Sequence, residues 1–217
     1  MNDTMLVDAR NGIRWWPTQI KPYLIIPFGF LGGLLLSVIA RLWMRWISTD
    51  PEFSWGGTIG IIAGFTVFFT AHATVFLGIR KAWSRRWLTV ARVGAVFFSI
   101  LLFNAQGAVM LPTVVCVTLA TARTDWPGWL RIIICVPGLI IPGFIARDIG
   151  SDFGWGIATA GRIILFVLIY YVVVAAARIT AAPQADSWRM NRVLRTILWF
   201  SVAGVAISIA ISVALNG

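Results

Sequence analysis

The chain has 217 residues, of which 59% are hydrophobic and only 12% are charged, and its mean hydropathy is +0.86. A soluble domain carries about twice that fraction of charged residues, so the composition excludes a soluble globule and predicts an all-α, polytopic membrane bundle. The net charge of +10 then places lysines and arginines in short loops, where they contact anionic lipid headgroups, and does not favour nucleic acid as a partner.

Five apolar runs are each about long enough to cross a membrane as a helix, which needs roughly 20 residues. They lie at 23–40, 56–78, 130–146, 157–177 and 194–215. Because these runs are continuous, they favour helices over barrel strands, which would alternate apolar and polar residues over about ten positions.

The segment 88–122 is also poor in charge, and it is too long for one span. It is just long enough for two short spans joined by a tight turn, and the sequence NAQG at 104–107 has the chemistry of a turn. A re-entrant loop at 99–112 is the alternative, and it would leave six crossings or fewer.

The distribution of positive charge favours seven spans with the N-terminus in the cytoplasm and the C-terminus outside. In that arrangement thirteen lysines and arginines lie inside and three lie outside. The inside residues are Arg10, Arg14, Lys21, Arg80, Lys81, Arg85, Arg86, Arg123, Arg131, Arg178, Arg189, Arg192 and Arg195, and the outside residues are Arg41, Arg45 and Arg147. A single span at 88–122 would reverse everything downstream and nearly abolish this bias.

The domain organisation expected is one integral membrane domain over 1–217, with a cytoplasmic segment at 1–22 and a transmembrane bundle at 23–215. The first 22 residues are polar and lack the apolar core of a signal peptide, so we expect the first span to direct insertion. Many of the 12 tryptophans flank the apolar runs, as in an aromatic belt. The segment 184–195 has the pattern of a short basic amphipathic helix on the inner surface.

Small residues recur at four-residue spacing in the first two spans, where they would let helix backbones approach closely. These candidate helix-interface residues are Gly29, Gly33, Gly56, Gly60 and Gly64. The pattern fits packing within one bundle, and it also fits the interface of a homo-oligomer.

His72 is the only histidine, and it lies in the middle of the second predicted span. A haem between spans usually needs paired histidines, and a zinc site needs more ligands, so we expect no cofactor and no metal. A single intramembrane histidine is either a hydrogen-bonded packing residue or a proton relay. The two lysines, Lys21 and Lys81, lie at span ends, which excludes the Schiff base of a retinal protein.

Four charged residues near the predicted spans at 130–146 and 157–177 are further candidates. Arg162 lies about one and a half turns into its span, and either snorkels to the surface or pairs with Asp148 or Asp152. Those two acids are spaced i, i+4, so with Arg147 beside them they could face one way and bind a cation or an amine. Solvated charges at a membrane edge are the simpler interpretation.

Two Pro-Gly pairs, Pro137-Gly138 and Pro142-Gly143, interrupt the run at 130–146. Proline removes a backbone hydrogen bond and clashes with the preceding helical turn, so the pairs predict that this span is broken into short pieces. Broken backbone at membrane depth often lines a polar cavity in transporters. A kinked packing helix is the equally favoured alternative.

The sequence IIPGFIARDIGSDFGWGIATAGRIILF at 140–166 resembles a repeat in the small membrane subunit of poly-γ-glutamate (capsule) synthases. The matching positions are Pro142, Gly143, Ile145, Ala146, Ile149 and Gly154. The sequence IRKAWSRRW, at 79–87, and the later LLFN also resemble the middle of that family. The family's earlier Pro-Gly copy is replaced here by Pro27, Phe28 and Gly29. The resemblance implies that a polyanion is handled, with 135–150 and Arg162 on its path, and that a partner chain carries out the chemistry.

These observations predict a non-enzymatic subunit of a larger complex for polymer synthesis or export, in the inner membrane of a prokaryote. The chain shows no nucleophile–base pair, glycine-rich phosphate loop or HExxH motif. Other membrane or cytoplasmic subunits, or further copies of the chain, would be its partners. A small homo-oligomeric transporter or channel, with His72 as a gate or relay, is one alternative. A membrane sensor that signals through basic loops is another.

Overall fold

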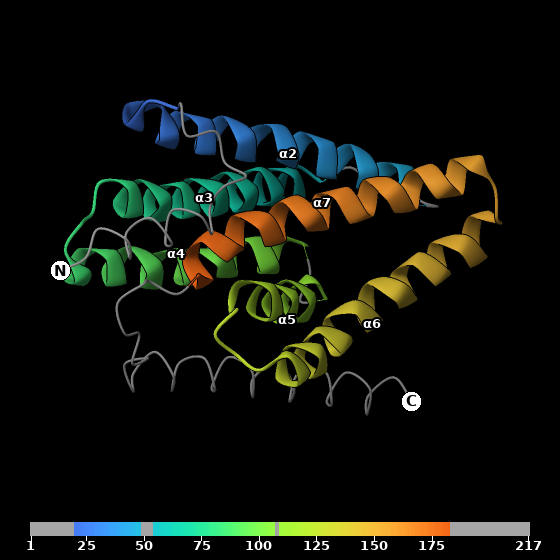
Figure 1. Ribbon diagram of the computed structural model, residues 1–217. Coiled ribbons are helices and arrows are strands. Elements are labelled where there is room, and N and C mark those ends of the chain that lie inside the picture. Colours follow the sequence, from blue (N-terminus) through green and yellow to red (C-terminus); the bar gives the residue numbers. More distant parts are fainter. Residues whose placement is uncertain (1–19, 49–53, 107–108, 183–217) are drawn as a thin grey trace. The chain divides into compact units, whose positions relative to one another are not determined.

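The computed structural model describes residues 20–48, 54–106 and 109–182, and every regular element in these ranges is a helix (Figure 1). In chain order they are η1 (Pro22–Leu24), α2 (Ile25–Ile47), α3 (Trp55–Arg80), α4 (Arg85–Gln106), α5 (Met110–Ala122), α6 (Gly128–Phe153) and α7 (Ile157–Ala181). The all-α fold class predicted from composition is therefore confirmed for the described residues.

Five of these helices, α2, α3, α4, α6 and α7, are long and apolar enough to cross a membrane. The protein is thus an integral membrane protein with a helical bundle. The predicted spans at 23–40, 56–78, 130–146 and 157–177 correspond to α2, α3, α6 and α7. The predicted last span, the amphipathic helix at 184–195 and most of the 1–22 segment lie outside the described residues.

The helices α2 and α6 each continue about two turns beyond the apolar runs that predicted them. The extra turns contain charged residues and tryptophans, such as Arg45 and Trp46 in α2 and Arg147 and Asp148 in α6. A helix satisfies its backbone polar groups internally whatever its side chains are. Hydropathy therefore marks the depth of the hydrocarbon layer and not the end of the helix.

The segment 88–122 forms parts of two helices, α4 and α5, as predicted, but the first three residues of the predicted turn at 104–107 are the last three of α4. The two helices differ in length: α4 has 22 residues and α5 has 13. At 1.5 Å per residue α5 is only about 20 Å long, which is shorter than the hydrocarbon core of about 30 Å. The helix α5 is therefore too short to count as a full span by itself.

Side-chain hydrogen bonds show which helix ends lie together. The C-terminal part of α3 contacts the start of α2 through Arg80, whose Nη1 donates to the carbonyl oxygen of Ile20 at 2.6 Å. Arg92, near the start of α4, donates to the carbonyl of Ala182 just after α7 at 3.0 Å. Arg178, near the end of α7, donates to the carbonyl of Thr121 at the end of α5 at 3.4 Å.

We call this end of the bundle the basic end. Its described lysines and arginines are Lys21, Arg80, Lys81, Arg85, Arg86, Arg92, Arg123, Arg131 and Arg178. The opposite end contains Arg41, Arg45, Arg147 and Arg162, together with Asp148 and Asp152. The loops that positive-charge counting assigns to one side of the membrane therefore gather at one end, because α5 returns to the end from which α4 starts.

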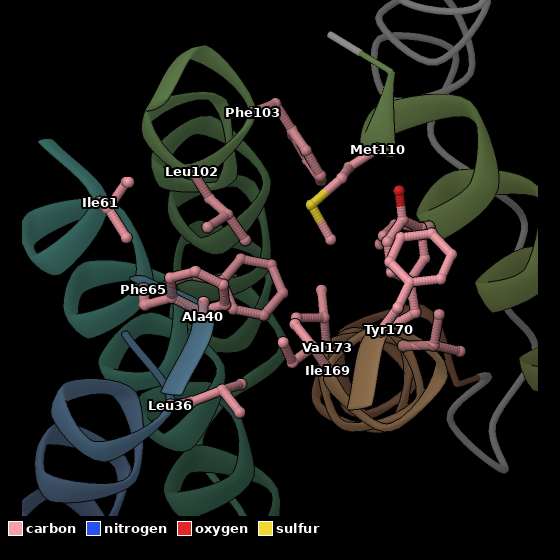
Figure 2. Packing of buried hydrophobic residues seen from close by; sticks show 14 of the residues in the cluster. Leu36, Ala40, Ile61, Phe65, Leu102, Phe103, Met110, Ile169, Tyr170 and Val173 are labelled. Carbon is pink, nitrogen blue, oxygen red and sulfur yellow. The ribbon is translucent and has the colours of Figure 1, made fainter. Parts of the chain in front are cut away.

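The core lies mainly between α2, α3, α4, α5 and α7 (Figure 2), and Ile149 of α6 also belongs to it. Phe65 of α3, Leu102 of α4 and Val173 of α7 are each 0% exposed. Met110, at the start of α5, lies between the side chains of α4 and those of α7 in Figure 2. Most exposed side chains on the outer faces are also apolar, as expected where lipid replaces water.

Candidate functional site

His72 lies at a junction of three helices and is 3% exposed. Its Nδ1 atom is 2.6 Å from the hydroxyl of Thr180 on α7, and its Nε2 atom is 3.4 Å from the hydroxyl of Ser99 on α4. The ring also packs edge-to-face on Phe68, with 4.3 Å between the ring centroids. One side chain of α3 thus ties two neighbouring helices to it in the interior of the bundle.

The donors around His72 assign a direction to this hydrogen-bond chain. The Ser99 hydroxyl donates to the carbonyl oxygen of Ala95 at 2.7 Å, so its oxygen accepts from Nε2–H of the histidine. Nδ1 is then the acceptor for the hydroxyl of Thr180. The chain ends on the Ala95 carbonyl, which passes no proton on, so this geometry favours a neutral packing histidine over a proton relay.

Three arginines meet at the last turn of α5, at the basic end, and a fourth lies near one of them. Arg131, in the first turn of α6, donates from Nε to the carbonyl of Ala120 at 2.7 Å. Arg178 donates to the adjacent carbonyl, that of Thr121. Cations are favourable at the C-terminal end of a helix, where carbonyl groups lack intrahelical partners, and this is the local reason that the two arginines meet there.

The other two arginines of this group are buried. Arg123 is 8% exposed; it forms an ion pair with Asp125 at 2.7 Å and lies 5.3 Å from the ring centroid of Trp126. Arg92 is 5% exposed and lies close enough to Arg123 for the two positive charges to repel each other. We call Arg92, Arg123, Arg131 and Arg178 the arginine cluster. Asp125 supplies the one carboxylate that forms an ion pair among the described residues.

Arg162, at the opposite end, is bound by α2 and by aromatic rings. Its Nε donates to the carbonyl of Trp46 at 3.2 Å, and its guanidinium lies 4.0 Å from the ring centroid of Phe153 and 5.3 Å from that of Trp46. Trp43 donates in turn to the carbonyl of Arg162 at 2.8 Å. The guanidinium therefore joins α2, α6 and α7.

The pairing of Arg162 with Asp148 or Asp152, which was the alternative to a near-surface anchor, is absent among the described residues, whose one ion pair lies at the basic end. The expectation overlooked the carbonyls at the end of α2, which compete well for a guanidinium because a helix end leaves them unsatisfied. Asp148, Asp152 and Arg147 are exposed, as charges at a membrane edge would be.

The prediction that the Pro-Gly pairs break the span is wrong, because Pro137 and Pro142 both lie inside the continuous helix α6. Each proline removes one backbone donor, and membrane helices tolerate this loss by local adjustment of the freed groups. The glycines that follow the two prolines differ in surroundings. A Cβ on Gly138 would lie 2.9 Å from the Cβ of Cys116 on α5, whereas one on Gly143 would meet nothing within 4 Å.

This difference gives a paired prediction for the contact between α5 and α6. Gly138→Val is expected to destabilise the protein by about 2 kcal/mol, as overpacking of a close helix contact does. Gly143→Val is the matched control and should change stability by less than about 0.5 kcal/mol. Thermal unfolding of both variants in detergent measures the difference, and equal effects would disprove the close contact at Gly138.

The glycines of α2 and α3 lie mainly inside the bundle. Gly29 and Gly33 of α2 face α3 at distances that leave no room for a Cβ, and a Cβ on Gly64 of α3 would lie 3.0 Å from the Cα of Leu102 on α4. A Cβ on Gly56 would contact only Ser54 of its own chain segment. Gly60 is half-buried. The spacing pattern therefore describes internal packing at three of its five positions.

Sequence reasoning did not identify Thr180 and Ser99 as partners of His72, nor the arginine cluster. Thr180 is 108 residues away from His72, and no spacing rule connects the two. The sequence did contain a signal that these arginines lie together. Arg123 and Arg131 flank one short loop, and Arg178 lies at a span end on the same predicted side of the membrane. The sequence analysis used these arginines only to orient the spans in the membrane, and so it did not predict that their side chains lie together.

Comparisons with protein-family models, with curated proteins and with solved structures find no match to this chain.

Proposed function

We propose that the protein is a non-enzymatic membrane subunit of a larger assembly that makes or exports a polymer, and that α6 contacts its partner subunits. The observation that carries this proposal is the exposure of α6. Only 6% of its apolar window is buried by the described residues, against 44% for α3 and 44% for α7. A helix so little covered by the other described helices offers surface to a further helix, which in this proposal belongs to another chain.

The second half of α6 carries a small residue between larger apolar ones, an arrangement that favours helix association in a membrane. Gly143 lies open next to the exposed side chains of Ile140 and Phe144. A small residue between larger apolar ones lets another helix approach closely, and packing of this kind drives association where lipid is as apolar as the side chains. We call Ile140, Gly143 and Phe144 the α6 notch.

The resemblance of 140–166 to the poly-γ-glutamate synthase subunit supports a polyanion as the polymer. In this proposal the chain lies in the inner membrane of a prokaryote with seven spans, and its basic end faces the cytoplasm. The positive charge gathered there supports this orientation, and it would attract an acidic polymer or an acidic partner. A partner chain supplies the chemistry.

Purification of the chain from its native membranes in mild detergent tests the proposal. We expect a stoichiometric partner that includes an ATP-dependent ligase. Ile140→Trp, which fills the α6 notch, should lower recovery of that partner about tenfold. Val90→Trp, on the exposed face of α4, is the matched control and should recover it normally.

Three outcomes would overturn the proposal. The first is a lone homo-oligomer in place of a complex. The second is substrate-dependent flux by the chain reconstituted alone, which would favour the transporter alternative. The third is a large loss of stability in Ile140→Trp itself, which would mean that the notch is covered by the chain's own apolar segment at 194–215.

A further inference from the structure

We propose that Arg131 and the start of α6 form a binding site for the phosphate group of an anionic membrane lipid. The site lies at the basic end, where α5 ends and α6 begins. It is distinct from the α6 notch, which lies more than two helical turns further along the same helix.

One hydrogen bond holds the side chain of Arg131 in place, while its other guanidinium N–H groups form no hydrogen bond to the described residues. Its Nε–H bond to Ala120 holds the side chain against the end of α5. Its two terminal nitrogens make no hydrogen bond to the described residues, and the side chain is half-buried. A guanidinium has five N–H donors in a planar fork that matches the oxygens of a phosphate. Arg131 is therefore positioned to receive an oxyanion.

The surroundings of Arg131 strengthen its attraction for an anion. Arg123 and Arg178 lie at the same turn of α5. The helix α6 has no acidic residue in its first turn and no side-chain cap, so its N-terminal dipole adds positive potential. Asp125 is the nearest described carboxylate in sequence, and it is bound to Arg123.

Apolar surface for an acyl chain lies beside this site on α6. Ile132, on the flank of the helix next to Arg131, is 66% exposed, and Trp129 and Ile133, on the outer face, are 64% and 59% exposed. Tryptophan favours the headgroup level of a membrane, so a headgroup-level ring and apolar side chains border the cation. Free phosphate would use the cation alone, whereas a lipid uses all three, and the lipid is therefore the ligand we infer.

Native mass spectrometry of the purified full chain tests this site with two lipids of equal acyl chains, phosphatidylglycerol and phosphatidylcholine. We expect the wild type to retain phosphatidylglycerol about tenfold better. Arg131→Gln should reduce this preference to about twofold or less, since a charge-assisted hydrogen-bond pair is lost. Arg131→Lys keeps the charge but lacks the planar fork and the Nε–H that holds the side chain at Ala120, so it should keep only part of the preference.

Arg147→Gln is the matched control, because it removes an exposed arginine of the same helix at the opposite end. It should leave the lipid preference unchanged. An unchanged preference in Arg131→Gln, or an equal loss in Arg147→Gln, would overturn the site. Displacement of the lipid by millimolar inorganic phosphate would overturn the lipid as its ligand. Because purified chain and added lipid suffice, the result is independent of the proposed polymer assembly.

Discussion

Gly33→Val is expected to destabilise the bundle by about 3 kcal/mol, the upper end of the usual cost of overpacking. A Cβ at this position would lie 2.7 Å from the carbonyl oxygen of Phe65 and 2.8 Å from the Cα of Thr66. Both are backbone atoms of α3, so no side-chain rotation relieves the clash. The helices α2 and α3 would have to separate, and their contact is among the most extensive in the described bundle.

Gly32→Val is the control for this prediction, since it adds the same side chain one residue earlier on α2. A Cβ on Gly32 would meet nothing within 4 Å, so its effect should stay within about 0.5 kcal/mol. Thermal or denaturant unfolding in mixed micelles measures both. Equal stability of the two variants would show that α2 does not approach α3 through Gly33.

His72→Ala is expected to cost about 3 kcal/mol, through a buried cavity and the loss of two interhelical hydrogen bonds. Truncation of a large buried ring costs a few kcal/mol, and an interhelical hydrogen bond in a membrane adds about 0.6 kcal/mol on average. Thr180→Val, which removes only the hydroxyl partner, should cost about 1 kcal/mol. Unfolding of both single variants and the double variant gives the coupling between the two residues.

Thr74→Val provides a reference for this cycle, because the Thr74 hydroxyl donates only to the carbonyl of Thr70 in its own helix. Its removal should have little effect on stability. If Thr180→Val cost no more than Thr74→Val, or if His72 and Thr180 proved additive, the three-helix junction would not contribute to the stability of the bundle. A proton relay would instead show loss of activity in His72→Asn at unchanged stability.

Hydrophobicity predicted the helices well because a membrane helix forms its backbone hydrogen bonds within itself. A long enough run of apolar residues is then sufficient for a span. The division of 88–122 into α4 and α5 was predictable for a second reason, since positive charge counting requires an even number of crossings there. The length of α5 was not predictable, because residues 93–122 contain no charged residue to mark where the hydrocarbon ends.

The candidate sites were less predictable, because their geometry depends on tertiary contacts. The Pro-Gly pairs suggested broken backbone, yet α6 remains one helix, since local propensity does not decide the structure where backbone polar groups have no water to bind. Arg162 was sought among carboxylates nearby in sequence, whereas its partners, Trp46 and Phe153, include one residue more than 100 positions away. Sequence separation hides such partners.

The proposed orientation and the gathering of positive charge at one face depend on the placement of all basic loops on one side of the membrane, with α5 returning to the side from which α4 starts. Labelling of single cysteines from each side of sealed vesicles tests this directly. The background carries Cys116→Ala and Cys135→Ala, and single cysteines replace Lys81, Thr124 and Ser151, which are all exposed.

With an impermeant thiol reagent, positions 81 and 124 should react from the cytoplasmic side and position 151 from the opposite side. Reaction of 81 and 124 from opposite sides would contradict the returning helix pair and, with it, the gathering of positive charge at one face.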